Sequence, residues 1–355
     1  MKTMSLAKNH STTIYNLIAA PFVAGNAYQK SAEEIFRQTA NFNVKKQGKF
    51  FDAIHGQFIN LFYAGRYFEY INLWENILAC LQRIDSQLYN NIQKGTPYYF
   101  CGVACFKAED YQRAVFYFDA ALIEDKNRST GWKKLPAALF LTLNTRNKKQ
   151  FAFDLTCHTA DLMKETLKEF RVASQDNYSL KNLRKYFLAQ SLFEAHEWRS
   201  AITALFSFVL EREKRIQEFS LRSIYGGTME PFYLHLFKGC LLLETLFKLS
   251  PMWKGKEETA MLGTILNDIK MRNKLGLTDR ISEVKKIFNE VVGLNAAWRN
   301  RGISPADRFV WTAYGIRNTT GHKLSWSASM TLDDYKNISE DILFAIYLVL
   351  LKLYR

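Results

Sequence analysis

The sequence predicts an all-α protein in two parts, a helical-repeat region in residues 1–228 and a helical bundle in residues 229–355. Only 17 glycines and 6 prolines occur among 355 residues, which is few for a fold built from strands and tight turns. Apolar residues recur at helical spacing along most of the chain. Clear helix-start signals precede the last helices.

Composition and charge indicate a globular, basic protein. Hydrophobic residues make up 48% of the chain and charged residues 23%, as in globular proteins. The formal net charge is +14, and both predicted parts are basic. This favours a polyanionic partner such as RNA, DNA or an acidic membrane, the alternative being a protein that is basic without such a partner.

Cysteines and apolar runs exclude several classes of protein. Five scattered cysteines do not form the framework of a disulfide-rich secreted domain, and no Cys/His cluster completes a metal site. The N-terminus lacks the apolar core of a signal peptide. The most apolar run, 342–351, is too short to span a bilayer. We therefore expect a cytoplasmic protein with no membrane partner and no metal or other cofactor.

Three segments of the first region share one spacing pattern. The clearest covers residues 98–125, and its small or apolar positions are Gly102, Cys105, Tyr111, Ala114, Phe118 and Ala121. Equivalent positions in the other two segments are Phe58, Leu61, Tyr67, Tyr70, Trp74 and Ile77, and then Ala189, Leu192, Trp198, Ala201, Leu205 and Phe208. Each pattern predicts two amphipathic helices joined by a tight turn, with small residues at the helix crossing.

These segments resemble degenerate tetratricopeptide repeats. They recur at separations of 44 residues (Tyr70 to Ala114) and 87 residues (Ala114 to Ala201), in place of the family's regular repeat of about 34. The resemblance implies stacked helix pairs and a surface on which a protein regulator could bind. It leaves open whether the repeats bind protein, RNA or another domain.

Residues 126–150 contain seven basic residues and no acidic one. They predict two basic loops on either side of a short apolar helix. The candidate RNA-binding residues are Trp132, Lys133, Lys134, Arg146, Lys148 and Lys149, with the lysines and the arginine contacting phosphate and the tryptophan stacking on a base. The alternative is a pair of solvated turns.

The second region begins after a break at residues 221–230, where two glycines precede Pro231. The helix that follows ends at Ser250-Pro251 and is apolar nearly all round, which predicts a central place in a bundle. Further helices are expected at 256–274, 281–297 and 305–317, the last one starting at Ser304-Pro305. Thr331-x-x-Asp334 predicts a capping box for a final helix at 332–354.

The motif Arg317-Asn318-x-x-x-His322 lies between the last two helices. Arginine binds phosphate oxygens with a rigid fork of donors, and histidine can transfer a proton near neutral pH. Asn318 and His322 are four residues apart and would share a helix face. The residues between them, Thr319, Thr320 and Gly321, are weak helix formers and favour a frayed end or a turn. A glycine there would allow close approach of an RNA backbone.

An all-helical bundle that carries this motif between its last two long helices resembles a HEPN domain, over residues 229–355. The resemblance implies a metal-independent endoribonuclease in which a 2′-hydroxyl attacks the adjacent phosphate. It implies that Arg317 stabilises the negative charge on the phosphorane and that His322 moves or positions the proton. It gives Asn318 an orienting role. It also implies a homodimer with a composite site. Lys323, next to the histidine, is a candidate phosphate contact. Joined to helical repeats, such a domain suggests a prokaryotic defence or toxin effector, of the abortive-infection or CRISPR-linked kind.

The alternative is a non-catalytic adaptor, in which the repeats bind a protein or nucleic acid and the bundle dimerises. The motif would then be a surface helix end. Two polar residues of the apolar helix, Lys238 and Glu244, are either buried against the motif or exposed at the helix edge, and exposure is the expectation. A supporting role for His235, on the same helix, stays open.

Overall fold

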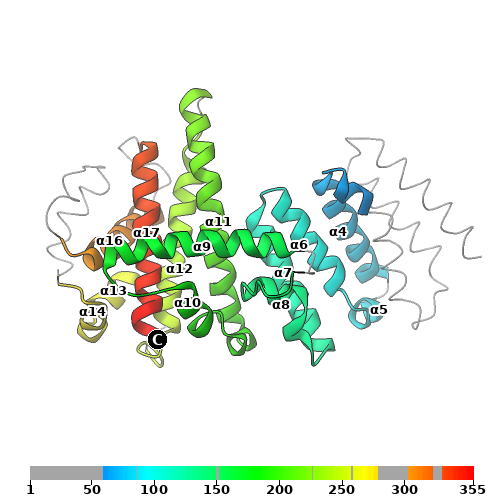
Figure 1. Ribbon diagram of the computed structural model, residues 1–355, viewed down its shortest axis with the longest axis horizontal. Coiled ribbons are helices and arrows are strands. Elements are labelled where there is room, and N and C mark those ends of the chain that lie inside the picture. The colour runs from blue at the N-terminus through cyan, green and yellow to red at the C-terminus, as the bar shows by residue number, and fades with distance from the viewer. Residues whose placement is uncertain are drawn as a thin grey trace, which may run out of the picture. The chain divides into compact units, whose positions relative to one another are not determined.

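The computed structural model describes residues 59–84, 86–148, 152–225, 227–256, 259–278, 303–322 and 330–355. Within these ranges every regular element is a helix and no strand occurs, which confirms the all-α prediction. The chain divides into two compact units, Met1–Ala138 and Leu139–Arg355 (Figure 1). None of the helices in these ranges combines the length and the apolar character needed to cross a bilayer.

The first unit contains the clearest of the predicted helical hairpins. Its helices are α4 (Tyr67–Ile84), α5 (Ser86–Asn91), α6 (Gly95–Lys107) and α7 (Tyr111–Arg128), followed by the 3-10 turn η2 (Trp132–Lys134). α6 and α7 pack closely as a pair. A Cβ atom on Gly102 would lie 3.2 Å from the backbone oxygen of Ala114 and from the ring of Phe118. Because glycine has no Cβ, the two helices can cross at this distance, as the repeat pattern predicts.

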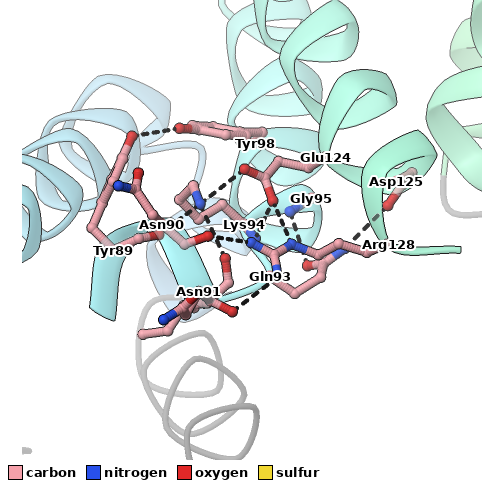
Figure 2. A network of polar contacts seen from close by, with 11 residues as sticks. Tyr89, Asn90, Asn91, Gln93, Lys94, Gly95, Tyr98, Glu124, Asp125 and Arg128 are labelled. Carbon is pink, nitrogen blue, oxygen red and sulfur yellow. Dashed lines mark hydrogen bonds and ion pairs between the residues drawn. The ribbon is translucent and has the colours of Figure 1, made fainter. Parts of the chain in front are cut away.

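A polar network joins the start of α6 to the end of α7 (Figure 2). Lys94 is only 4% exposed, and its Nζ lies 2.8 Å from Glu124 Oε1. The same Nζ donates to the backbone oxygens of Tyr89 and Ile92. Arg128 contacts the other carboxylate oxygen of Glu124 through Nε at 3.0 Å. This network satisfies a buried ammonium group, which would otherwise be costly to remove from water.

The second unit is a larger helical bundle. Its helices are α9 (Phe153–Ser174), α10 (Leu180–Tyr186), α11 (His196–Tyr225), α12 (Glu230–Leu249), α13 (Leu262–Asn267), α14 (Ile269–Leu275), α16 (Pro305–His322) and α17 (Leu332–Leu353), while α8 (Pro136–Leu141) spans the division between the units. α17 is buried along most of its length and packs against α12 and α16. It begins with the predicted capping box of Thr331 and Asp334. α9 crosses α17 (Figure 1), where the rings of Phe170 and Phe344 lie 5.7 Å apart.

The division between the units differs from the predicted boundary at residue 228. α11 belongs to the same core as α12 and α17, since His235 Nε2 lies 2.9 Å from the backbone oxygen of Phe208. Arg212 Nε also donates to Ser339 Oγ at 3.0 Å. The break between α11 and α12 therefore lies within one core, because a short connection between two long helices needs the same residue types as a domain linker.

Two other predicted elements differ from the structure. The third repeat segment is not a helical hairpin, since residues 190–194 form a 3-10 turn ahead of the 30-residue α11. The helix expected at 256–274 is replaced by α13 and α14, separated at Asp268, whose side chain caps α14 by accepting from Met271 N at 3.0 Å. The helix expected at 281–297 and Phe58 of the first repeat segment lie outside the described residues.

Candidate functional site

The start of α16 is anchored by a buried carboxylate. Ser304 Oγ accepts a hydrogen bond from Asp307 N at 3.1 Å, which caps the helix as predicted. Asp307 is fully buried and accepts from Thr278 N at 3.1 Å and from Trp311 Nε1 at 3.2 Å. These contacts tie the first turn of α16 to the chain that follows α14, and so fix the direction in which its later turns run.

α16 continues through Gly321 to His322, in contrast to the frayed end that the sequence favours. Thr319 and Thr320 are buried on its inner side, so packing outweighs their weak helix propensity. Arg317 and Asn318 are partly exposed, and Gly321 is exposed. The helix places Asn318 and His322 on successive turns of one side, but the side chain of His322 and all of Lys323 lie outside the described residues.

Arg317 is held by a carboxylate from α12. Its Nε donates to Glu244 Oε2 at 3.2 Å, and Lys248 Nζ donates to Glu244 Oε1 at 2.9 Å. The side chain of Arg317 is 19% exposed and that of Glu244 is 11% exposed. The expectation that Glu244 reaches solvent is therefore wrong, because this carboxylate is stabilised between two cations against the motif. Lys238 is partly exposed and pairs with Glu211 at 2.8 Å.

One end of the Arg317 guanidinium lies beside Gly321. In the part of the chain that the structure describes, Glu244 is its hydrogen-bonding partner, and the contact uses Nε. A Cβ atom on Gly321 would lie 3.8 Å from Arg317 Nη1 and 3.6 Å from the ring of Phe237. Glycine at this position places no side chain beside Nη1, and the two Nη groups of arginine are the paired donors that bind an oxyanion bidentately.

Two titratable groups near α12 are not available for proton transfer. Burial lowers the pKa of His235 to about 3, although its hydrogen bond to the Phe208 carbonyl opposes the shift. Nδ1 of this imidazole lies 2.8 Å from Tyr335 Oη, so both ring nitrogens have partners inside the core. Burial also raises the pKa of the Cys240 thiol, with Arg317 acting in the opposite direction. His235 is thus a neutral core histidine that connects α11, α12 and α17.

The other predicted binding residues are divided between the two units. Trp132 is only 8% exposed, and the Nζ atoms of Lys126 and Lys133 each lie 5.6 Å from its ring centroid. This corrects the prediction that the tryptophan is available to stack on a base. Lys133 and Lys134 are exposed in the first unit, whereas Arg146 and Lys148 are exposed in the second. Lys149 lies outside the described residues.

From the sequence, burial of Glu244 against the motif was the less favoured of two alternatives, and Lys248 was missed. Glu244 and Lys248 are one helical turn apart, so their pairing was readable from the spacing. A carboxylate in an otherwise apolar helix was the signal that one partner would be buried. Long-range packing decides that α12 lies against α16. The residues around the motif therefore could not show that Arg317 pairs with Glu244.

Comparison with known proteins adds no relative. No family model matches the chain, and neither the curated proteins nor the solved structures contain a match. Among the described residues, no group of three or more His, Cys, Asp and Glu side chains could hold a metal ion.

Proposed function

We propose that this chain is a metal-independent endoribonuclease of the HEPN type, with Arg317, Asn318 and His322 at its site. The observation that carries the proposal is the set of contacts made by the Arg317 guanidinium. Buried Glu244 holds the guanidinium at Nε, and Nη1 lies beside Gly321, which has no side chain to cover it. An arginine held at Nε, with its Nη donors left for a ligand, suits charge that develops on a phosphate during reaction.

The proposed reaction cleaves RNA by attack of a 2′-hydroxyl on the adjacent phosphorus. The bond from phosphorus to the 2′-oxygen forms, and the bond to the 5′-oxygen breaks, giving a cyclic phosphate and a 5′-hydroxyl. One proton leaves the 2′-hydroxyl, and another reaches the departing 5′-oxygen. His322 carries a proton in this scheme, Arg317 stabilises the non-bridging oxygens, and Asn318 orients the reacting groups. Lys323 contacts a neighbouring phosphate.

The proposed enzyme is a homodimer with a composite site at the C-terminal bundle. The outer surface of α12 supports this assignment, because Leu234 and Leu241 are 45% and 42% exposed. Phe237 lies on the same side of the helix and borders Gly321. A second copy seated on this surface would bury apolar area and bring a second motif towards the first.

The proposed setting is a prokaryotic defence or toxin system, either abortive infection or a CRISPR-linked response. An enzyme that cuts cellular RNA must be restrained until it is needed, and the helical repeats are the proposed site for a protein regulator. The substrate is RNA, and the compartment is the cytoplasm. Exposed Lys133, Lys134, Arg146 and Lys148 are proposed as secondary phosphate contacts.

The experiment incubates the full chain with labelled single-stranded RNA in EDTA. Arg317→Ala and His322→Ala are compared with Arg171→Ala, a matched variant at an exposed arginine of α9. We expect cleavage by the wild type and by Arg171→Ala, and loss of cleavage in the two motif variants. Cleavage that survives in both motif variants contradicts the site, and cleavage that EDTA abolishes contradicts the metal-independent mechanism.

The second candidate is a non-catalytic adaptor, which the exposed leucines of α12 also favour because they suit a dimer without any chemistry. Its repeats would bind a protein or nucleic acid. Analytical ultracentrifugation of Leu241→Glu tests the dimer in both cases. A dimer that this variant dissociates, in a chain that cleaves no RNA under any condition, supports the adaptor over the ribonuclease.

A further inference from the structure

A hollow of about 270 Å³ opens in the second unit, where the C-terminal ends of α9, α14 and α17 meet. Its lining consists of Asp176, Lys274, Leu351, Lys352 and Arg355. None of these residues belongs to the site around Arg317. Leu351 is buried, whereas Lys274 and Arg355 are exposed, so the hollow joins an apolar surface to charged groups that water can reach.

The charges around this hollow do not cancel. Asp176 is the one carboxylate among the lining side chains, and its Oδ1 lies 2.9 Å from Lys352 Nζ. In the described ranges no side-chain carboxylate pairs with Lys274 or Arg355, so the lining side chains are three cations and one carboxylate. Lys185, outside the lining, lowers the pKa of the nearby Tyr186 phenol most, and Arg355 lowers it further.

Cations at helix C-termini often complement the helix dipole, and that explanation suits Lys352 in the last turn of α17. It suits the other two cations less well. α14 has seven residues, so Lys274 faces a short run of aligned peptide dipoles. Arg355 lies beyond Leu353, the last residue of α17. The helix dipole therefore accounts for neither charge fully, and both side chains are open to an anion from solvent.

We propose that this hollow binds a small ligand that carries a phosphate monoester. Its volume is near the lower end of small-molecule sites, which suits one phosphorylated sugar or nucleoside better than a strand of nucleic acid. Arg355 offers a planar fork to two phosphate oxygens, and Lys274 adds a point charge. The apolar surface at Leu351 receives the part of the ligand that carries no charge. The site is independent of the ribonuclease proposal.

Calorimetric titration of the full chain tests this site, with inorganic phosphate and adenosine 5′-monophosphate as probes and with sodium chloride and adenosine as controls. We expect saturable binding of both phosphates and no binding of adenosine. Lys274→Met and Arg355→Met should each weaken binding at least tenfold, whereas Lys168→Met, at an exposed lysine of α9, should not. Lys274→Arg should retain most of the affinity, because it keeps the charge.

Three results would overturn the proposal. The first is a phosphate response no larger than that of chloride at equal ionic strength. The second is equal weakening by Lys168→Met and Lys274→Met, since that indicates a diffuse charge effect. The third is binding that survives both hollow variants but disappears in Arg317→Ala, because the phosphate is then bound at the motif. Retained binding in Arg317→Ala, combined with loss in both hollow variants, supports the hollow.

Discussion

Each unit contains a glutamate held between a lysine and an arginine. In the first unit, Glu124 lies 2.8 Å from Lys94 Nζ and 3.0 Å from Arg128 Nε (Figure 2). In the second unit, Glu244 lies 2.9 Å from Lys248 Nζ and 3.2 Å from Arg317 Nε. The chemical groups and the atoms that meet are the same, so any difference in role must come from the surroundings.

The difference lies in the donors that remain on each arginine. Arg128 uses Nη1 and Nη2 on the backbone oxygens of Asn91 and Asn90, at 2.9 and 2.6 Å. Arg317 makes no such bond within the described residues, and its Nη1 faces the space beside Gly321. Arg128 is therefore a structural clamp, whereas the Nη donors of Arg317 have no partner among the described residues, as the proposed phosphate contact requires. Unused hydrogen-bonding capacity, more than charge or motif, distinguishes the candidate site from the structural network.

The largest expected difference concerns the two arginines. Arg317→Ala should reduce RNA cleavage about 10³-fold, because a donor set for developing phosphate charge is removed. Arg128→Ala should leave cleavage by the folded enzyme unchanged and should instead destabilise the first unit, because its contacts with Glu124 and two backbone oxygens are lost. Initial rates on labelled RNA and urea unfolding measure the two effects. Equal loss of cleavage in both variants would remove the distinction between clamp and site.

The next largest difference concerns the two glutamates, whose substitution should change the stability of their units by different amounts. Glu124→Gln leaves the buried Lys94 without a carboxylate and should cost the first unit on the order of 3 kcal/mol. Glu244→Gln should cost about 1 kcal/mol, since Lys248 and Arg317 are partly exposed and regain water. Its main effect should be on cleavage, lowered about tenfold or more because Arg317 is less well oriented. Hydrogen exchange in α6 and α12 reports each unit separately. A larger stability loss for Glu244→Gln would contradict the comparison.

Gly95 and Gly321, the glycines beside the two glutamates, differ in the space available for a Cβ atom. A Cβ atom on Gly95 would lie 2.6 Å from Asp125 Oδ1 and from Gln93 Nε2, which are hydrogen-bonded to each other. Gly95→Ala should therefore destabilise the first unit by about 1–2 kcal/mol. Gly321→Ala meets only ordinary contacts and should raise the stability of α16 by up to ~1 kcal/mol with cleavage retained. Thermal unfolding and the RNA assay test both changes.

A bulkier residue sharpens the test at Gly321. Gly321→Leu should impede access to the Arg317 guanidinium and lower cleavage, with Gly321→Ala as the matched control. If alanine and leucine are tolerated equally in the RNA assay, the space beside Gly321 is not the path by which phosphate reaches Arg317.

The sequence predicted local features well because short-range chemistry decides them. The capping box at Thr331 and the helix start at Ser304 appear as predicted, and so does the close crossing at Gly102. The all-α class also follows from composition and periodicity. The motif itself was readable, but the carboxylate that holds Arg317 was not, because its residues are 73 positions apart in the chain.

Features that depend on long-range burial were predicted less well. Trp132 stands among basic residues that suggest an exposed loop, yet its ring is packed inside the first unit. The boundary at residue 228 was predicted from glycines and a proline. These residues occur both in turns within one core and in linkers between two cores. The burial of Glu244 and the assignment of α11 to the second unit both depend on which helix faces which. That information is spread over the whole core and is absent from any single segment.

The two units should also differ in how their stability responds to pH. Burial, with Glu124 adding to it, raises the pKa of Asp125 to about 6 from an ordinary value of 3.8. The stability that this group contributes is present below its ordinary pKa and is lost as the pH rises through about 6. Burial lowers the pKa of His235 to about 3 from 6.5, so its contribution is present above 6.5 and is lost as the pH falls. Between pH 6 and 4 the two groups therefore act with opposite sign.

Each of these groups changes the stability of its unit by at most about 1.4 kcal/mol per pH unit. Two variants isolate them, since His235→Gln and Asp125→Asn offer similar hydrogen bonds without a titrating group in this range. Urea unfolding at pH 6.5, 5.5 and 4.5, read by hydrogen-exchange labelling of α7 and α12, gives the slope for each unit. His235→Gln should flatten the acid destabilisation of the second unit and leave the first unchanged, and Asp125→Asn should remove the opposite trend from the first. A variant that alters the pH slope of the other unit would show that the two cores do not unfold independently. The stabilities of the Glu124 and Glu244 clusters would then have to be measured as one coupled equilibrium.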